Sequence, residues 1–138
     1  MLLAAIGSGF VLAFLAPILT ARLGRRIGWA LALLPTTLAV YLVGLLTQAT
    51  AGQITSLSIP WVPALGLALT FRADGLSLLF AVIISGVGAL VMIYAGAYLE
   101  GHRDLGRFYA WLLNFMAAML GVALADNLLM LFVFWELT

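Results

Sequence analysis

The chain has 138 residues, of which 66% are hydrophobic and only 8% are charged, whereas ordinary globular domains carry about a quarter charged residues. Six arginines, no lysine and five acidic residues give a formal net charge of +1, so no basic surface for nucleic acid is expected. With no cysteine and a single histidine, the sequence excludes disulfides, cysteine nucleophiles and histidine-cluster metal sites, and no cofactor is expected. This composition is typical of an integral membrane protein.

Two apolar segments at the start of the chain are long enough to cross a bilayer, which requires about 20 residues for about 30 Å of hydrocarbon. The first is predicted over about residues 2–20, ending near Pro17, and the second over about residues 27–47. The first segment lacks a basic n-region, and its apolar run is too long for a signal peptide. We therefore expect it to be a retained transmembrane helix.

A different pattern follows between about residues 54 and 71. Apolar residues alternate there with small or polar ones, and a period of two predicts a strand. The preceding run, Ile54–Ile59, is separated from this strand by the sequence PWVP, Pro60–Pro63, which favours a turn and forbids a continuous helix. A short extramembrane β-hairpin is predicted, and the alternative is an irregular interfacial loop. The alternating apolar residues are Leu65, Leu67, Leu69 and Phe71.

Three more apolar segments complete the chain, at about residues 74–99, 107–124 and 127–138. The last supplies only about half of the length that a transmembrane helix needs. The predicted fold is an all-α integral membrane protein with four complete transmembrane helices and the first half of a fifth. The β-hairpin lies between helices two and three, and residues 1–138 form a single fragment of a membrane domain.

The arginines predict the orientation, because short cytoplasmic loops retain an excess of basic residues. All except Arg72 lie in the loops between helices one and two and between helices three and four. We therefore expect a multi-pass protein of the cell membrane with its N-terminus and hairpin outside and the arginine-bearing loops in the cytoplasm. Aromatic residues near those loops are expected at the cytoplasmic membrane interface. They are Tyr94, Tyr98, Tyr109 and Trp111.

Small residues at four-residue spacing predict where the helices approach one another closely. Such stripes occur in the first, third and fourth helices. Asn114 lies about two turns into the fourth helix, where its amide requires a partner helix or a water-filled cavity. Helix contact and a role in lining an ion pathway both remain open for Asn114. The stripes are Ala5, Gly9 and Ala13; Ala81, Ser85 and Ala89; and Ala117, Gly121 and Ala125.

Glu136 is the main candidate for an ion or proton pathway. It lies nine residues after Asn127, which corresponds to about 13 Å along a helix and places it near the midplane of the bilayer. A carboxylate there costs about 2.5 to 3.5 kcal/mol, so such groups face a protein interior or a hydrated cavity and often belong to ion pathways. The alternative is a structural glutamate that holds a neighbouring helix.

Asp74 and Asp126 each precede an apolar run, where a carboxylate can accept the free N–H groups of a helix N-terminus. Capping is the favoured interpretation for both residues, and a place at the mouth of an ion path is the alternative. An exposed ion pair between Arg72 and Asp74 is also expected, and it would contribute little to stability.

The motifs DGLS, RF, LADNLL and FWELT occur in this order between residues 71 and 138. This region resembles the N-terminal region of the A subunit of multisubunit Mrp-type Na+/H+ antiporters. Those proteins are similar to the antiporter-like L subunit of respiratory complex I and to subunits of membrane-bound hydrogenases. Before residue 71, only the two-helix layout and the predicted hairpin fit the family.

The resemblance implies that Glu136 corresponds to the family's midmembrane glutamate, which interacts with a lysine on a later helix. This chain has no lysine and ends before those helices. The implied function is that of a secondary transporter subunit, not an enzyme, which couples proton movement to Na+ export. Its implied partners are the other subunits of a hetero-oligomeric complex, the lipid bilayer, Na+ and H+. The alternatives are a fragment of a proton-pumping subunit of complex I or a hydrogenase, and a non-transporting membrane scaffold.

Overall fold

The chain is mostly helical in the computed structural model, which describes residues 2–62, 64 and 67–138, apart from the Arg25 side chain. Helices α1 to α4 are each long and apolar enough to cross a membrane, and α5 has nine residues. The predicted class, with four spanning helices and a hairpin after the second, is confirmed. The elements are α1 (Leu2–Leu23), η1 (Gly24–Arg26), α2 (Ile27–Thr50), β1 (Thr55–Val62), β2 (Leu67–Ala73), α3 (Gly75–Tyr98), α4 (Leu105–Leu124) and α5 (Leu128–Glu136).

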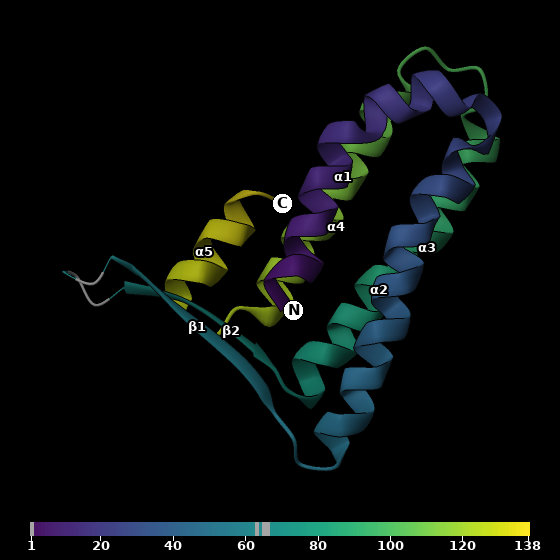
Figure 1. Cartoon of the computed structure of the whole chain (residues 1–138). Coiled ribbons are helices and arrows are strands. Elements are labelled where there is room, and N and C mark those ends of the chain that lie inside the picture. The colour runs from purple at the N-terminus through teal and green to yellow at the C-terminus, as the bar shows by residue number, and fades with distance from the viewer. Residues whose placement is uncertain (1, 63, 65–66) are drawn as a thin grey trace.

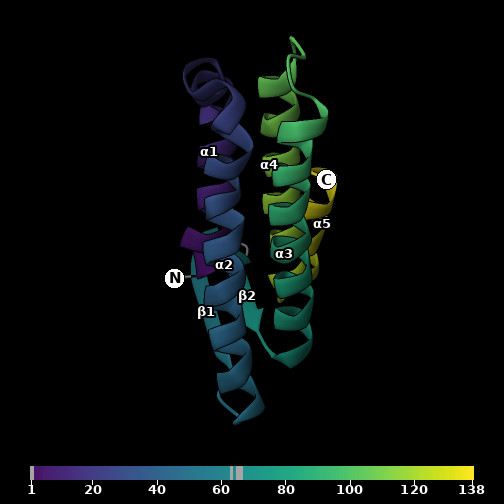
Figure 2. The same ribbon diagram turned by 90° about the vertical axis from the view of Figure 1, so that its right-hand side faces the viewer.

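The four long helices form two closely packed pairs, α2 with α3 and α1 with α4, and α3 also packs against α4. Figure 1 shows both pairs running side by side, with α5 against the outer side of α4. In Figure 2, η1 and the connection between α3 and α4 lie at one end of the bundle, and the hairpin lies toward the other. The arginine-bearing loops therefore share one end.

Helix α1 continues to Leu23, so the prediction that the first helix ends near Pro17 is wrong. Pro17 removes one backbone donor, but ending the helix would expose several unpaired backbone groups, which is more unfavourable where no water is available. The Thr20 hydroxyl donates to the Ala16 carbonyl at 2.7 Å in the turn that follows. Pro35 lies inside α2 in the same way.

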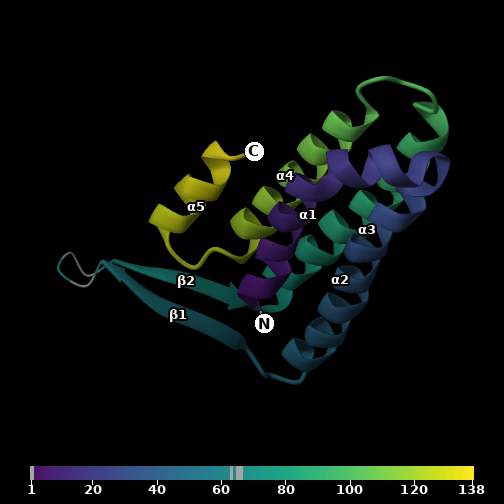
Figure 3. The same cartoon turned by 45° about the horizontal axis from the view of Figure 1, so that its top comes forward.

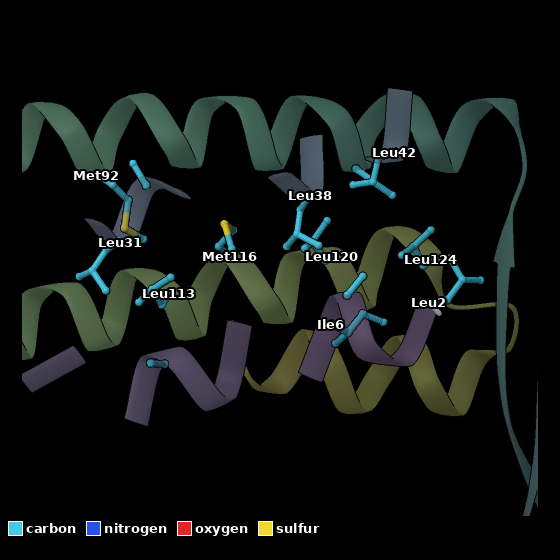
Figure 4. Close-up of a cluster of buried hydrophobic side chains, with 14 of the residues drawn as sticks. Leu2, Ile6, Leu31, Leu38, Leu42, Met92, Leu113, Met116, Leu120 and Leu124 are labelled. Atoms are coloured by element: carbon cyan, nitrogen blue, oxygen red, sulfur yellow. The ribbon is translucent and has the colours of Figure 1, made fainter. Parts of the chain in front are cut away.

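Aliphatic side chains fill the space between the two helix pairs (Figure 4). Each of the four long helices contributes to this cluster, and α3 contributes Met92 to it. Because the side chains come from all four helices, the cluster holds both pairs together. The other labelled members are Leu2 and Ile6 on α1, Leu31, Leu38 and Leu42 on α2, and Leu113, Met116, Leu120 and Leu124 on α4.

Small residues permit the closest helix contacts, as the four-residue stripes predict. An added Cβ at Gly9 would lie 2.8 Å from the Ala117 Cβ, so α1 and α4 approach closely there. An added Cβ at Gly28 would lie 2.8 Å from the Met92 carbonyl oxygen and 3.1 Å from the Gly96 Cα. All of the stripe residues except Ala125 are buried.

Tyr109 is fully buried, and its hydroxyl donates to the Met92 carbonyl at 3.1 Å. Tyr109, one of the aromatic residues expected at the membrane interface, thus points into the bundle, because the glycines at the α2–α3 crossing leave room for its hydroxyl. Tyr94 and Tyr98 are exposed and stack with ring centroids 5.4 Å apart. Trp111 is exposed as well.

The hairpin strands β1 and β2 are antiparallel, with Thr55 opposite Ala73 and Pro60 opposite Ala68. Figure 3 shows the hairpin running from the end of α2 past the start of α5. On its other edge, β2 makes an isolated bridge between Phe71 and Ala125, in the connection from α4 to α5. Pro63, Leu65 and Gly66, which the sequence places in the turn and the second strand, lie outside the described residues.

Candidate functional site

The start of α5 is capped by Asn127, whose Oδ1 accepts from the Met130 backbone N–H at 2.8 Å. The prediction that Asp126 caps this helix is wrong. The Asp126 backbone N–H donates to the Thr70 carbonyl at 3.0 Å, and its side chain is exposed. Pairing with β2 thus extends the chain through Asp126 and leaves the next residue in the capping position.

Asn127 also binds the hairpin. Its Nδ2 donates to the Ala68 carbonyl at 2.9 Å and to the Thr70 Oγ1 at 2.6 Å. One side chain therefore joins the first turn of α5 to strand β2. Sequence patterns alone did not predict this role, although asparagine before an apolar run is itself a capping signal.

Phe134 fixes the second half of α5 against its surroundings. Its ring meets the Phe71 ring edge-on, with centroids 5.8 Å apart. On its other side, Phe134 lies so close to Gly121 that an added Cβ there would overlap the ring. The small residue in α4 therefore creates the space that the aromatic ring of α5 occupies.

Glu136 is the last residue of α5, and its side chain is exposed. In the part of the chain that the structure describes, its carboxylate has no hydrogen-bond or ion-pair partner. Asn114 lies near this end of the helix, because its Nδ2 donates to the Leu137 carbonyl at 3.5 Å. Asn114 thus contacts a neighbouring helix end, and it also lines a cavity of about 370 Å³ beside α1.

Asp74 caps α3 as predicted. The Ser77 backbone N–H donates to the Asp74 Oδ1 at 2.9 Å, and the Asp74 N–H donates to the Ser77 Oγ at 2.8 Å. The bond from the Ser77 backbone N–H lowers the pKa of the Asp74 carboxyl, and the nearby Arg72 lowers it further. Arg72 Nε lies 3.6 Å from Asp74 Oδ2 in an exposed ion pair, as expected.

Asp74 and Asp126 line the same cavity of about 210 Å³, together with Arg72. The structure thus brings two of the four candidate residues together near the start of α5, and Asn114 lies toward the Glu136 end. The two ends are separated by the length of α5, about 13 Å at 1.5 Å per residue. Within the described residues there is no group of three or more histidine, cysteine or acidic side chains suited to a metal.

Comparison with known proteins identifies relatives over nearly the whole chain. It is 48% identical over 134 residues to the A subunit of the Na+/H+ antiporter of Alkalihalophilus pseudofirmus, a match that covers 95% of this chain and 16% of the relative. The chain belongs to the family of Na+/H+ antiporter A subunits. The A1 subunit of the Na+/H+ antiporter of Staphylococcus haemolyticus is 42% identical over 113 residues, which cover 82% of this chain and 14% of the relative.

A solved structure and a family model agree with this membership. The structure of the Mrp complex from Dietzia sp. DQ12-45-1b matches with a TM-score of 0.82 and 38% identity, covering 99% of this chain and 14% of the matched chain. Residues 59–109 also match the family model described as the N-terminus of chain 5 of NADH-ubiquinone oxidoreductase, complex I. The chain spans about one sixth of the length of these curated antiporter relatives.

Proposed function

We propose that this chain forms part of a cation/proton antiporter subunit that couples proton movement to Na+ export across the cell membrane. The 48% identity to the A subunit of a Na+/H+ antiporter over 95% of the chain is the observation that carries this proposal. Its partners would be the other subunits of a hetero-oligomeric complex, the surrounding lipid, Na+ and H+. It would act as a secondary transporter and not as an enzyme.

We further propose that Glu136 belongs to the proton pathway. A carboxylate inside a bilayer is unfavourable unless it faces a protein interior or a hydrated cavity. The family resemblance implies a lysine partner for this glutamate, and this chain has no lysine, so other protein segments would provide the basic partner. Asn114, close to the same end of α5, would line the pathway beside Glu136.

Asp74 and Asp126 would lie at the outer mouth of the pathway. Their shared cavity near the start of α5 supports this placement. Asp74 is engaged in capping α3, so Asp126, with its exposed side chain, is the more available carboxylate. The two aspartates would raise the local concentration of cations through their charge and would not form a tight binding site.

The Glu136→Gln variant of the complete antiporter tests the pathway role, because it preserves the shape of the side chain and removes its titration. We expect Na+-dependent dissipation of an imposed ΔpH in everted vesicles to fall at least about tenfold, at unchanged protein levels. Normal exchange would refute the role of Glu136 and favour a scaffold. Asp104→Asn, at an exposed loop residue, controls for loss of a carboxylate.

A proton-pumping subunit of a redox enzyme remains the second candidate, because residues 59–109 match the complex I family model. The two functions differ in their source of energy. Exchange that proceeds in vesicles with an imposed ion gradient and no electron donor supports the antiporter. Proton movement that requires a donor and a quinone acceptor supports the redox-driven pump instead.

The proposed orientation places the N-terminus and hairpin outside and the arginine-bearing loops in the cytoplasm. Single cysteines at Arg103, between α3 and α4, and at Thr55, in the hairpin, are suitable reporters because both residues are exposed. We expect a membrane-impermeant maleimide to label Thr55→Cys in intact cells and Arg103→Cys only in everted vesicles. The reverse pattern would overturn the orientation.

A further inference from the structure

Asn127 occupies the junction of three elements: β2, the connection after α4, and α5. Its side chain makes three hydrogen bonds, one to the first turn of α5 and two to β2. Its backbone neighbours are held as well, because the Asp126 N–H donates to the Thr70 carbonyl and Ala125 bridges Phe71. Capping of α5 would require only the bond from the Met130 backbone N–H to the Asn127 Oδ1.

We propose that Asn127 is a positioning residue for Glu136, which acts by fixing the first turn of α5 to strand β2. This inference rests on the proposed function of Glu136. Asn127 does not contact the carboxylate, which lies at the far end of the helix, and it influences Glu136 only through the orientation of α5.

The geometry gives this junction leverage. Nine residues separate Asn127 from Glu136, or about 13 Å along the helix. A tilt of about 10° at Asn127 would displace the Glu136 end by about 2 Å, and misplacement by about 1 Å can reduce a reaction rate about 100-fold. Met130 is buried and Phe134 packs over Gly121, so the junction at Asn127 orients α5 together with these two contacts.

The amide group is suited to this role in a way that no carboxylate is. Its Oδ1 accepts from the helix and its Nδ2 donates to β2, so both ends of the amide are used. Aspartate caps a helix as well as asparagine does but has no donor. The Asn127→Asp substitution therefore preserves the cap and removes the connection to the hairpin, which separates the two roles.

Substitutions at Thr70 test the bond between Asn127 and β2 independently of changes at Asn127 itself. Its Oγ1 accepts one of the two bonds from Asn127. Thr70→Val removes this acceptor while preserving the branched shape of the side chain, and Thr70→Ser restores the acceptor. If Asn127→Asp prevents assembly of the complex, this pair of variants still tests the proposal.

The experiment uses the complete antiporter complex in a cysteine-free background, with spin labels at Ser58→Cys in β1 and Trp135→Cys in α5, both exposed. Electron–electron resonance measures the distance distribution between the labels. Exchange in everted vesicles is measured across a pH series, with the maximal rate separated from the apparent KM for Na+. Gln53→Glu and Thr55→Val are matched controls beside the hairpin, because both residues are exposed and no hydrogen bond or ion pair among the described residues joins either side chain to α5.

We expect Asn127→Asp and Thr70→Val to broaden or shift the distance distribution, change the pH profile and lower the maximal rate at least about fivefold, with little change in KM. Thr70→Ser and both controls should resemble wild type. An unchanged distance distribution would overturn the proposal. A changed distribution with an unchanged pH profile and rate would also overturn it, because α5 would then move without affecting Glu136 chemistry.

The outcome for Glu136→Gln keeps this test separate from that of the proposed function. If Glu136→Gln abolishes exchange while the Asn127 and Thr70 variants behave as wild type, the proposed function stands and the positioning role fails. If Glu136→Gln leaves exchange intact, the pathway role fails, and the positioning proposal that rests on it fails with it.

Discussion

The α2–α3 crossing yields a quantitative prediction for Gly28→Ala. A Cβ at Gly28 would lie 2.8 Å from the Met92 carbonyl oxygen and 2.9 Å from the Tyr109 hydroxyl, about 0.6 Å and 0.5 Å closer than ordinary contacts that begin at 3.4 Å. The carbonyl belongs to a helix backbone, so α2 and α3 must separate. Overpacking of this kind costs about 1–3 kcal/mol, and the buried Tyr109–Met92 hydrogen bond, worth about 0.5–1.5 kcal/mol, would weaken.

Gly44→Ala provides the matched control, because Gly44 lies in the same helix and an added Cβ there would meet nothing within 4 Å. Both substitutions gain the same intrinsic helix preference, about 0.5–1 kcal/mol. The difference between them therefore isolates the clash, and we expect Gly28→Ala to be less stable than Gly44→Ala by about 1–3 kcal/mol. The free energy of unfolding is measured by SDS titration in detergent micelles with helical circular dichroism as the signal.

Equal stability of the Gly28→Ala and Gly44→Ala variants would refute the close α2–α3 contact. A double variant sharpens the test, because Tyr109→Phe removes one of the two clashing oxygens. The Gly28→Ala/Tyr109→Phe combination should then lose less free energy than the sum of the single losses. Strict additivity would indicate that the Tyr109 hydroxyl does not approach Gly28.

Two further predictions concern the site. Gly121→Ala would place a Cβ within the Phe134 ring, so we expect it to lower the free energy of unfolding by about 1–3 kcal/mol and to lower exchange. Adding Phe134→Leu should relieve both effects, and an unaffected Gly121→Ala variant would contradict the packing of α5. The pKa of Asp74 is lowered in the folded protein, so its carboxylate stabilises the fold at pH values above the ordinary pKa of 3.8. This contribution is lost as the pH falls through the pKa of the folded state. The unfolding free-energy difference between wild type and Asp74→Asn should therefore be constant from about pH 7 to 5 and shrink below about pH 4, and a difference that persists in acid would exclude the Asp74 carboxylate as its source.

The apolar runs and the period-two alternation predicted the architecture well, because a bilayer leaves few alternatives to helices of sufficient length. The strands that run from Thr55 and to Ala73 pair as a hairpin. The alternation of apolar with small or polar residues distinguishes this stretch from the uniformly apolar helices around it. Asp74 could be assigned as a cap because α3 begins at the next residue, so its position in the sequence alone places it at the helix N-terminus. These features depend on local sequence.

The features that the sequence did not predict depend on contacts between distant residues. Asp126 and Asn127 are both good caps, and only the pairing of the preceding connection with β2 decides between them. Tyr109 turns inward because glycines at positions 28 and 96, on two other helices, leave space for it. The pattern of a single helix carries no information about such partners.

Contacts along the whole of α5 determine where the helix places Glu136. The first turn of α5, its second half and the Leu137 carbonyl each contact a different neighbouring element. Hydrogen bonds of 2.6–2.9 Å fix its start to β2, Phe134 fills the space over Gly121, and the Asn114 amide donates to the Leu137 carbonyl at 3.5 Å. The bonds of Asn127 to β2 and the packing of Phe134 against α4 therefore together set the direction in which α5 carries Glu136.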